Sequence, residues 1–305
     1  MKNRGLFFTM AAIMLLTLFF ISYTFYSVIK DQSQIKERIQ TLDSFVKGAE
    51  EDLARQAYIA GFRTFVVYQT KIAETGNYIP NITSSSEELF FNGTLYGNPE
   101  SLMIGVTLPE LNTALQEKAN KINANFMISN YSLSIYQEDP WNVVFEINTN
   151  ILVEDQGGLA LWNKTEKIIS KVPISGFEDP IYTINTQSQV LNKIRQTPYS
   201  IFIIESDVSN LNAHLTNSYY LANPLSPSYL NRLQGNFSAD PNGIESIVNL
   251  QKLSSAGIVI SQKSGIDYIY FSPQTPTAHR ITGTPSWFYL DDAHLDTYQA
   301  SALAQ

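Results

Sequence analysis

The amino-terminal part of the chain begins with a long apolar run. Residues 6–29 contain no Asp, Glu, Lys, Arg or His. As an α-helix this segment would be about 36 Å long, and the hydrocarbon layer of a membrane is roughly 30 Å thick. The alternative is a cleaved secretory signal, whose apolar region covers about 7 to 15 residues before a small-x-small site. Because the run is longer and Ser22-Tyr23-Thr24 is a poor cleavage site, the pattern predicts an uncleaved transmembrane anchor.

A helical repeat follows the anchor. Apolar residues recur every three or four positions, which places them on one face of a helix. They are Ile39, Leu42, Val46, Ala49, Leu53 and Ala57. With no proline before Pro80, this stalk helix can extend toward Ile72, with Gly48 and Gly61 as candidate bends. The stripe is either a coiled-coil seam with a second chain or a face that packs on the chain's own head, and its short clean repeat favours the second interpretation.

The pattern then changes to loop, short helix and strands. Residues 77–105 are rich in Asn, Ser, Gly and Pro without a sustained period, which predicts loop. Thr107 and Glu110 have the spacing of a capping box, which predicts a helix from there to about Asn123. Three runs of alternating apolar and β-branched residues predict an antiparallel meander with one buried face. These runs are residues 126–136, 143–153 and 159–173.

The last part of the chain predicts short elements. Residues 210–229 are typical of loop with one short helix. Asp240 and Pro241 supply an N-cap and a proline at the first helical position, which predict a helix over residues 242–253.

Gly257 is placed to end that helix. Residues 258–261 and 267–271 predict a further hairpin around residues 263–265. The predicted fold class is α+β, with a long N-terminal transmembrane and stalk helix followed by an antiparallel β-meander head with short helices. The predicted divisions are 1–29 for leader and anchor, 30–75 for the stalk helix, 76–205 for the helix-and-sheet head and 206–305 for a C-terminal α+β segment.

Charges around the apolar run predict its orientation. Lys2 and Arg4 precede it without an acid, whereas Lys30 is followed at once by Asp31. By the positive-inside bias, we expect a single-pass protein of the cell membrane with a cytoplasmic amino terminus and the bulk of the chain outside. The net charge of −8 becomes −10 once Lys2 and Arg4 are removed, so the expected outer part is acidic. The short inner segment excludes a receptor that signals through its own inner domain.

Composition excludes further classes. The chain is 44% hydrophobic, 12% aromatic and 16% charged, a balance typical of a folded protein. It contains no cysteine, which excludes disulfide frameworks, thiolate catalysis and cysteine-ligated zinc or iron–sulfur sites. A sequence pI near 4.9 opposes nucleic-acid binding, because phosphate contacts depend on Lys and Arg.

The polar residues offer little catalytic signal. Asp291, Asp292, His294 and Asp296 lie within six positions but lack the spacing of a calcium loop, so we expect a solvated acidic segment. The chain has no GxSxG, HExxH, GxxxxGK or GxGxxG motif. We therefore predict no enzyme, no catalytic residue, no cofactor and no metal site. The histidines are His214, His279 and His294, and we expect the first two to be hydrogen-bonding loop residues.

Asn-x-Ser/Thr sequons become candidate glycosylation sites once the chain is placed outside the cell. They are Asn81, Asn92, Asn130, Asn163 and Asn236. Asn81 and Asn92 fall in the predicted loop, where a glycan is easily accommodated. Asn130 falls at a predicted strand start, which is sterically less favourable.

The leader itself resembles that of archaeal type IV pilins and related class III signal proteins. A short basic leader, Lys2-Asn3-Arg4-Gly5, meets an apolar helix at Leu6. The resemblance implies cleavage between Gly5 and Leu6 by a prepilin peptidase on the cytoplasmic face, with the helix retained. That family commonly has Glu at the fifth position after the junction, where this chain has Met10.

The second half is similar to uncharacterised membrane-anchored surface proteins of archaea, especially of small-genome lineages. The similarity is carried by residues 174–186, 228–250, 267–272 and 285–298. It implies location more than mechanism. The leading hypothesis is a non-catalytic, pilin-like structural or adhesive subunit whose partners are the lipid bilayer, like subunits or other envelope proteins, and not nucleic acid. The alternatives are a membrane-tethered enzyme or ligand-binding domain, and an anchored scaffold that dimerises through the stalk.

Overall fold

The computed structural model describes the backbone of residues 3–305 and the side chains of residues 7–30 and 32–305. Lys2, which carries part of the expected leader charge, lies outside the described residues. The chain divides into two compact units. The first contains Met1–Asp52, Asn112–Ser129 and Asn150–Glu166, and the second contains Leu53–Leu111, Asn130–Thr149 and Lys167–Gln305.

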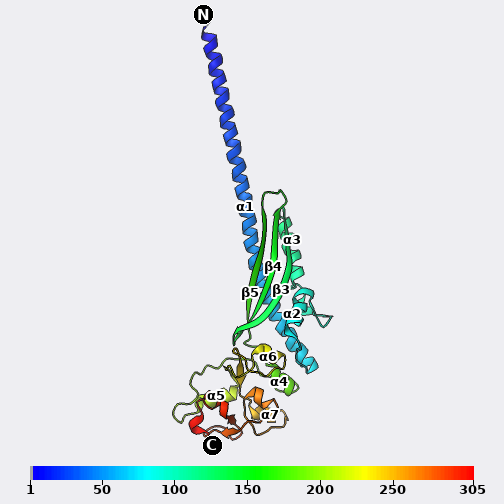
Figure 1. Cartoon of the computed structure of the whole chain (residues 1–305), viewed down its shortest axis with the longest axis vertical. Coiled ribbons are helices and arrows are strands. Elements are labelled where there is room, and N and C mark those ends of the chain that lie inside the picture. Colours follow the sequence, from blue (N-terminus) through cyan, green and yellow to red (C-terminus); the bar gives the residue numbers. More distant parts are fainter. Residues whose placement is uncertain (1–2) are drawn as a thin grey trace. The chain divides into compact units, whose positions relative to one another are not determined.

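One helix contains both the apolar run and the stalk repeat. Helix α1 extends over Asn3–Thr75 and is 73 residues long (Figure 1). The expected anchor, up to residue 29, and the expected stalk, from residue 30, are therefore parts of one continuous helix. Gly48 and Gly61 both lie inside α1. The predicted long N-terminal helix is confirmed.

The apolar stripe of α1 is buried against the chain itself. Leu42, Val46 and Ala49 are at most 3% exposed in the first unit, where the Phe45 and Phe126 rings meet edge to face at 5.8 Å. Leu53 and Ala57 are buried in the same way in the second unit. Packing on the chain's own head is thus confirmed at these positions, and they leave no open coiled-coil seam.

The predicted meander is confirmed with longer strands. Strands β3 (Ala124–Asp139), β4 (Asn142–Asp155) and β5 (Leu161–Pro173) form a three-stranded sheet in the order β3-β4-β5. On β4, Val143, Phe145 and Ile147 are buried, while Glu146 and Asn148 are partly exposed. Val144 is also buried, so the alternation is incomplete at the start of the strand.

Residues 77–105 are not the loop that composition suggests. Helix α2 covers Ile82–Asn92, with the Asn81 side chain accepting a hydrogen bond from the Ser84 backbone N–H and Gly93 in the left-handed conformation at its end. These are ordinary start and stop signals. A short hairpin of β1 (Thr94–Leu95) and β2 (Asn98–Pro99) and a 3₁₀ turn, η1 (Ser101–Met103), complete the segment.

The capping box at the next helix is confirmed. Helix α3 covers Leu108–Asn120, ending three residues before the predicted position. Glu110 Oε2 accepts hydrogen bonds from the Thr107 backbone N–H at 3.1 Å and from its hydroxyl at 2.7 Å. The Glu110 N–H donates in return to Thr107 Oγ1 at 3.4 Å. Both partners of the motif therefore act as its spacing predicts.

The C-terminal part of the second unit is built from short elements. The helices are α4 (Pro180–Asn185), α5 (Ser209–Asn217), α6 (Tyr229–Leu233), α7 (Leu250–Ser255), α8 (Asp267–Tyr270), η2 (Asp292–His294) and η3 (Ser301–Leu303). The strands pair as antiparallel β6 (Tyr220–Ala222) with β7 (Ile244–Ser246) and β8 (Ala278–Arg280) with β9 (Tyr289–Asp291). An apolar cluster that includes Leu211, Ile247 and Phe288 forms the core between them.

Two predicted elements in this part are wrong. Residues 242–253 are not one helix, because residues 244–246 pair with β6 and the helix begins only at Leu250, capped by Asn249. Asp240 caps a turn instead, accepting from the Asn242 N–H at 2.8 Å. The hairpin expected over residues 258–271 is replaced by α8. Gly257 does end α7, at a φ of +77°.

Candidate functional site

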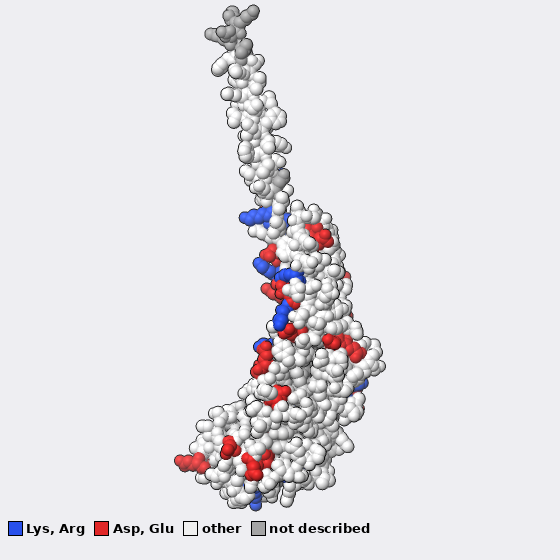
Figure 2. Space-filling view, viewed as in Figure 1, with Lys and Arg blue, Asp and Glu red and all other residues white. Residues whose placement is uncertain are grey.

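The most distinctive surface of the protein is the amino-terminal part of α1. Every large apolar side chain over residues 7–29 is between 49% and 72% exposed. Mean hydropathy over 18 residues reaches 2.0, and none of that window is buried. Figure 2 shows no Lys, Arg, Asp or Glu along this segment on the viewed face. Among the described residues it is the one helix whose length and composition suit a membrane crossing.

Hydroxyl groups within this segment are satisfied by the helix itself. Thr17 Oγ1 lies 3.0 Å from the Ile13 carbonyl and 2.8 Å from the Met14 carbonyl, and Thr24 Oγ1 donates to the Phe20 carbonyl at 2.8 Å. A polar group facing hydrocarbon needs such a partner, because lipid offers none. These threonines are therefore compatible with lipid on all sides of the helix.

A second unusual feature is a fully buried ionic cluster in the second unit. Arg232 lies between Asp179 and Asp267, and all three side chains are 0% exposed. Arg232 Nη1 contacts Asp179 Oδ2 at 2.5 Å and Asp267 Oδ2 at 3.0 Å, and Nη2 contacts Asp267 Oδ1 at 3.1 Å. Arg232 Nη2 also donates to the Ile244 carbonyl, and Nε donates to the Pro227 carbonyl at 3.3 Å. All five guanidinium N–H groups therefore have acceptors.

The two carboxylates of this cluster also accept several hydrogen bonds. Asp179 accepts from the Tyr220 hydroxyl at 2.8 Å and from the Ile181 N–H, while Asp267 accepts from the Ser246 N–H and hydroxyl. Burial raises the pKa of Asp179, and Arg232 opposes this rise. Burial also lowers the pKa of Arg232, but the two aspartates raise it by more, to above its usual value. Because the contacts to both aspartates come from donors, the geometry favours carboxylates around a guanidinium.

A second buried polar cluster surrounds His294. Its Nδ1 lies 2.6 Å from Asp291 Oδ1, and its Nε2 lies 3.3 Å from Glu245 Oε2 and 3.2 Å from the Tyr268 hydroxyl. Burial lowers the pKa of His294, but Asp291 and Glu245 raise it by more, to about 10. The ring therefore carries a positive charge near neutral pH.

Hydroxyl and amide groups complete the His294 cluster. Ser264 donates to Asp291 at 2.5 Å, Ser226 donates to Glu245 at 2.5 Å, and Asn223 donates to Glu245 at 2.8 Å. Asp291 and His294 are at most 2% exposed. The solvated acidic segment expected over residues 291–296 is thus wrong for these two residues, although Asp292 and Asp296 are exposed.

Both clusters draw on four segments that are far apart in the sequence. Asp179 comes from residues 174–186, Arg232 and Glu245 from residues 228–250, Asp267 from residues 267–272, and Asp291 and His294 from residues 285–298. Burial separates both clusters from solvent. Their chemistry is therefore that of a packed ionic core, which fixes how distant segments meet.

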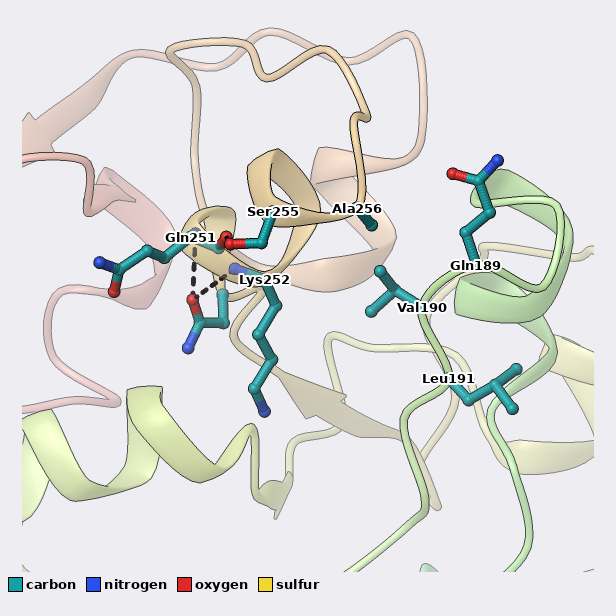
Figure 3. Close-up of a pocket in the computed structure, with 8 residues that line it drawn as sticks. Gln189, Val190, Leu191, Gln251, Lys252, Ser255 and Ala256 are labelled. Carbon is teal, nitrogen blue, oxygen red and sulfur yellow. Dashed lines mark hydrogen bonds between the residues drawn. The ribbon is translucent and has the colours of Figure 1, made fainter.

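An open hollow on the second unit is a separate candidate site (Figure 3). It has a volume of about 590 Å³, and Figure 3 shows Gln189, Val190 and Leu191 facing the segment of Gln251, Lys252 and Ser255. Burial and the neighbouring Arg195 both lower the pKa of Lys252. Lys252 is the cationic side chain in the lining of this hollow, and its charge favours an anionic group.

The other two histidines lie apart from such groupings. His214 is buried, its Nδ1 lies 3.1 Å from the Thr197 hydroxyl, and burial lowers its pKa to about 3. His214 lies in α5 rather than in a loop. His279 lies in β8 and pairs with the exposed Asp292 at 2.6 Å. Among the described residues, no group of three or more His, Asp or Glu side chains is arranged to hold a metal ion.

All five sequon asparagines are exposed. Asn81 precedes α2 as its N-cap and has extended backbone, whereas Asn92 is the last residue of that helix, so the expected loop position is wrong for Asn92. Asn130 lies inside β3 with a φ of +52°, and Asn163 lies in β5. The Asn236 side chain accepts from the Ser238 N–H at 3.0 Å. The candidate leader junction, Gly5–Leu6, lies within α1 at positions whose side chains are not described.

Comparisons with protein-family models, with curated proteins and with solved structures found no match.

Proposed function

We propose that this protein is a single-pass, membrane-anchored surface protein whose amino terminus is cytoplasmic and whose bulk is outside the cell. The observation that carries the proposal is the uniform exposure of the apolar side chains over residues 7–29 of α1. Exposed apolar area of this extent is unfavourable in water and favourable in lipid. Lys2 and Arg4 before the span support the orientation through the positive-inside bias.

Within this class, we propose a pilin-like structural or adhesive subunit. One helix supplies both the apolar segment and, through Leu42, Val46 and Ala49, part of the buried core beside the meander. The leader junction at Gly5–Leu6 resembles that of class III signal proteins. If subunits assemble, close packing of the apolar helices would drive it, with Ala11 and Ala12 as a small-residue face.

A non-catalytic role is favoured by the surroundings of the histidines. His294 has the carboxylate and hydroxyl neighbours that acid–base chemistry would use, but it is 1% exposed. His214 is fully buried, and burial keeps it neutral. His279 is partly exposed, and its Nε2 contacts the exposed Asp292 carboxylate rather than a hydroxyl nucleophile.

The mass of the mature amino terminus tests the proposal. We expect a chain that begins at Leu6 and that resists extraction from membranes by alkaline carbonate. A Gly5→Val variant should keep Met1, whereas the control Gly48→Ala should be processed normally. A chain beginning at Met1 would contradict pilin-like processing but retain the tether. A chain beginning after about Thr24 would contradict the anchor.

Orientation has its own test, because the protein has no native cysteine. A single cysteine at the exposed Gln251 should react with a membrane-impermeant maleimide in intact cells. In the Gly5→Val variant, which keeps the leader, a cysteine at Asn3 should react only after lysis. The opposite pattern would place the head in the cytoplasm.

The hollow at Lys252 supports a second candidate function, a tethered domain that binds an anionic group. Sulfate and inorganic phosphate are suitable probes. Lys252→Gln should abolish any binding measured by calorimetry, whereas Lys121→Gln, at another exposed lysine, should leave it unchanged. Absence of binding to the unmodified protein would contradict this second candidate.

A further inference from the structure

The loop between β4 and β5 exposes apolar side chains in the same compact unit as the apolar part of α1. Leu159, within the loop, and Leu161, the first residue of β5, are 51% and 62% exposed. Both belong to the first unit, as does α1 up to Asp52. Figure 1 places this loop at the end of the sheet that faces the amino-terminal part of α1.

The loop is fastened to the helix by a partly buried ion pair. Arg38 donates from Nε and Nη2 to Asp155 Oδ1 at 2.8 and 2.6 Å, and Nη2 also donates to the Asn123 carbonyl at 2.8 Å. Asp155 Oδ2 accepts from the Leu159 N–H at 3.0 Å, and the Asp155 N–H donates to the Ala160 carbonyl at 2.9 Å. These contacts thus fix the position of the loop along the axis of α1, beside Arg38.

The position of Arg38 along α1 is close to the end of the uncharged run. Arg38 lies nine residues after Ile29, which is about 14 Å along a helix. The interfacial layer of a bilayer adds about 5–8 Å to each side of the hydrocarbon. Figure 1 shows the loop extending from the end of the strands in the direction of the run.

The helix itself is incompletely covered in this interval. Ile35 and Ile39 continue the stripe of Leu42 toward the membrane, yet they are 42% and 40% exposed. Together with Leu159 and Leu161 they leave apolar side chains uncovered on both elements between the packed sheet and the apolar run.

We propose that the β4–β5 loop rests on the outer surface of the same bilayer that α1 enters, with Leu159 and Leu161 among the lipid headgroups. This inference rests on the proposed membrane anchor. A bilayer is favoured over a second copy of the chain because four exposed side chains are far fewer than the 20–30 residues a side of a stable protein interface. The anchor also brings the loop to the lipid without a separate encounter.

Trp162, the residue after Leu161, provides the readout. The other tryptophans, Trp141 and Trp287, belong to the second unit and can be replaced by phenylalanine. The full-length Trp141→Phe/Trp287→Phe protein is reconstituted into vesicles of phosphatidylcholine and phosphatidylglycerol. Part of the lipid carries bromine either near the headgroup or deep in the acyl chain. We expect the shallow bromine to reduce Trp162 fluorescence at least twofold more than the deep bromine.

Two matched variants locate the effect. Adding Leu159→Ser and Leu161→Ser should remove most of the quenching, and a protein that keeps Trp141 alone should show none. Quenching should not change with the ratio of protein to lipid. Quenching that requires crowded protein would assign the loop to a second copy instead.

The outcomes separate this inference from the proposed function. Failure of the protein to float with vesicles would overturn the anchor and this inference together. Flotation with unquenched Trp162, or with quenching unaffected by the two serines, would overturn the loop contact and leave the anchor intact.

Discussion

Glu245 and Ser246 are neighbours on β7, yet each belongs to a different buried ionic cluster. Glu245 accepts hydrogen bonds beside His294, while Ser246 donates to Asp267 in the Arg232 cluster at 2.7 Å. Side chains of successive strand residues point to opposite faces, so one short strand reaches both clusters. The C-terminal part of the protein is therefore organised around charges that this strand connects.

Replacing Arg232 should be strongly destabilising. Arg232→Met leaves Asp179 and Asp267 buried without a counter-charge, and breaking a buried pair in this way costs about 3–5 kcal/mol. Urea unfolding followed by Trp287 fluorescence measures the loss, since Trp287 packs against the neighbouring core. The exposed control Arg195→Met should change stability by less than about 1 kcal/mol. Equal effects of the two substitutions would contradict a special role for the buried cluster.

The stabilisation that His294 provides should be lost at alkaline pH. Its pKa is about 10 in the folded protein against an ordinary value of 6.5, so the folded state holds the proton more tightly. The resulting stabilisation is complete below pH 6.5 and is lost as the pH rises through 10. It amounts to about 3–5 kcal/mol in total. Urea midpoints measured from pH 6 to 10 should fall for the natural chain and fall much less for His294→Gln. If the urea midpoints of the two proteins changed with pH in parallel, His294 would not be the group responsible for the loss of stability.

His214 should act with the opposite sign. Burial lowers its pKa to about 3, so the folded state binds the proton less readily than the unfolded chain does. Its contribution is complete above pH 6.5 and is lost as the pH falls toward 3. His214→Phe should weaken the loss of stability between pH 6.5 and 4 in the same urea measurements. His279→Phe, at a more exposed position, serves as control, and an identical flattening by it would count against the prediction.

Two glycines of α1 should respond in opposite ways to alanine. A Cβ at Gly61 would lie 2.7 Å from Phe145 Cε2 and 3.1 Å from Val172 Cγ2, whereas a Cβ at Gly48 has no such neighbour within 4 Å. Gly61→Ala should destabilise by about 1–3 kcal/mol through overpacking. Gly48→Ala should stabilise by about 0.5–1 kcal/mol through helix propensity. Thermal unfolding of the full chain measures both, and stabilisation by Gly61→Ala would contradict the close packing.

The elements that are long enough to display a hydrophobic period were predictable from the sequence. The stripe through Leu42, Val46 and Ala49 and the alternation along β4 both report burial directly, because the period of the side chains matches that of the element. The capping box of Thr107 and Glu110 marked the start of α3 for a local reason, two reciprocal hydrogen bonds.

The short C-terminal elements and the ionic clusters were not predictable in this way. Strand β7 and helix α8 contain three and four residues, too few to display a period. Tertiary pairing with β6 therefore prevailed over the helix signal of Asp240 and Pro241. Asp179, Arg232 and Asp267 resemble surface residues in sequence because charged side chains are rarely buried, and their partners meet only in the fold.

The ionic core also has a consequence for biogenesis. Arg232 needs Asp267, and His294 completes the neighbouring cluster, so neither cluster is neutralised until the chain has been synthesised as far as His294. A chain that emerges from the ribosome amino end first therefore keeps this region open until late. Under the proposed placement of the head outside the cell, such delayed closure would keep this region unfolded for passage through a translocation channel.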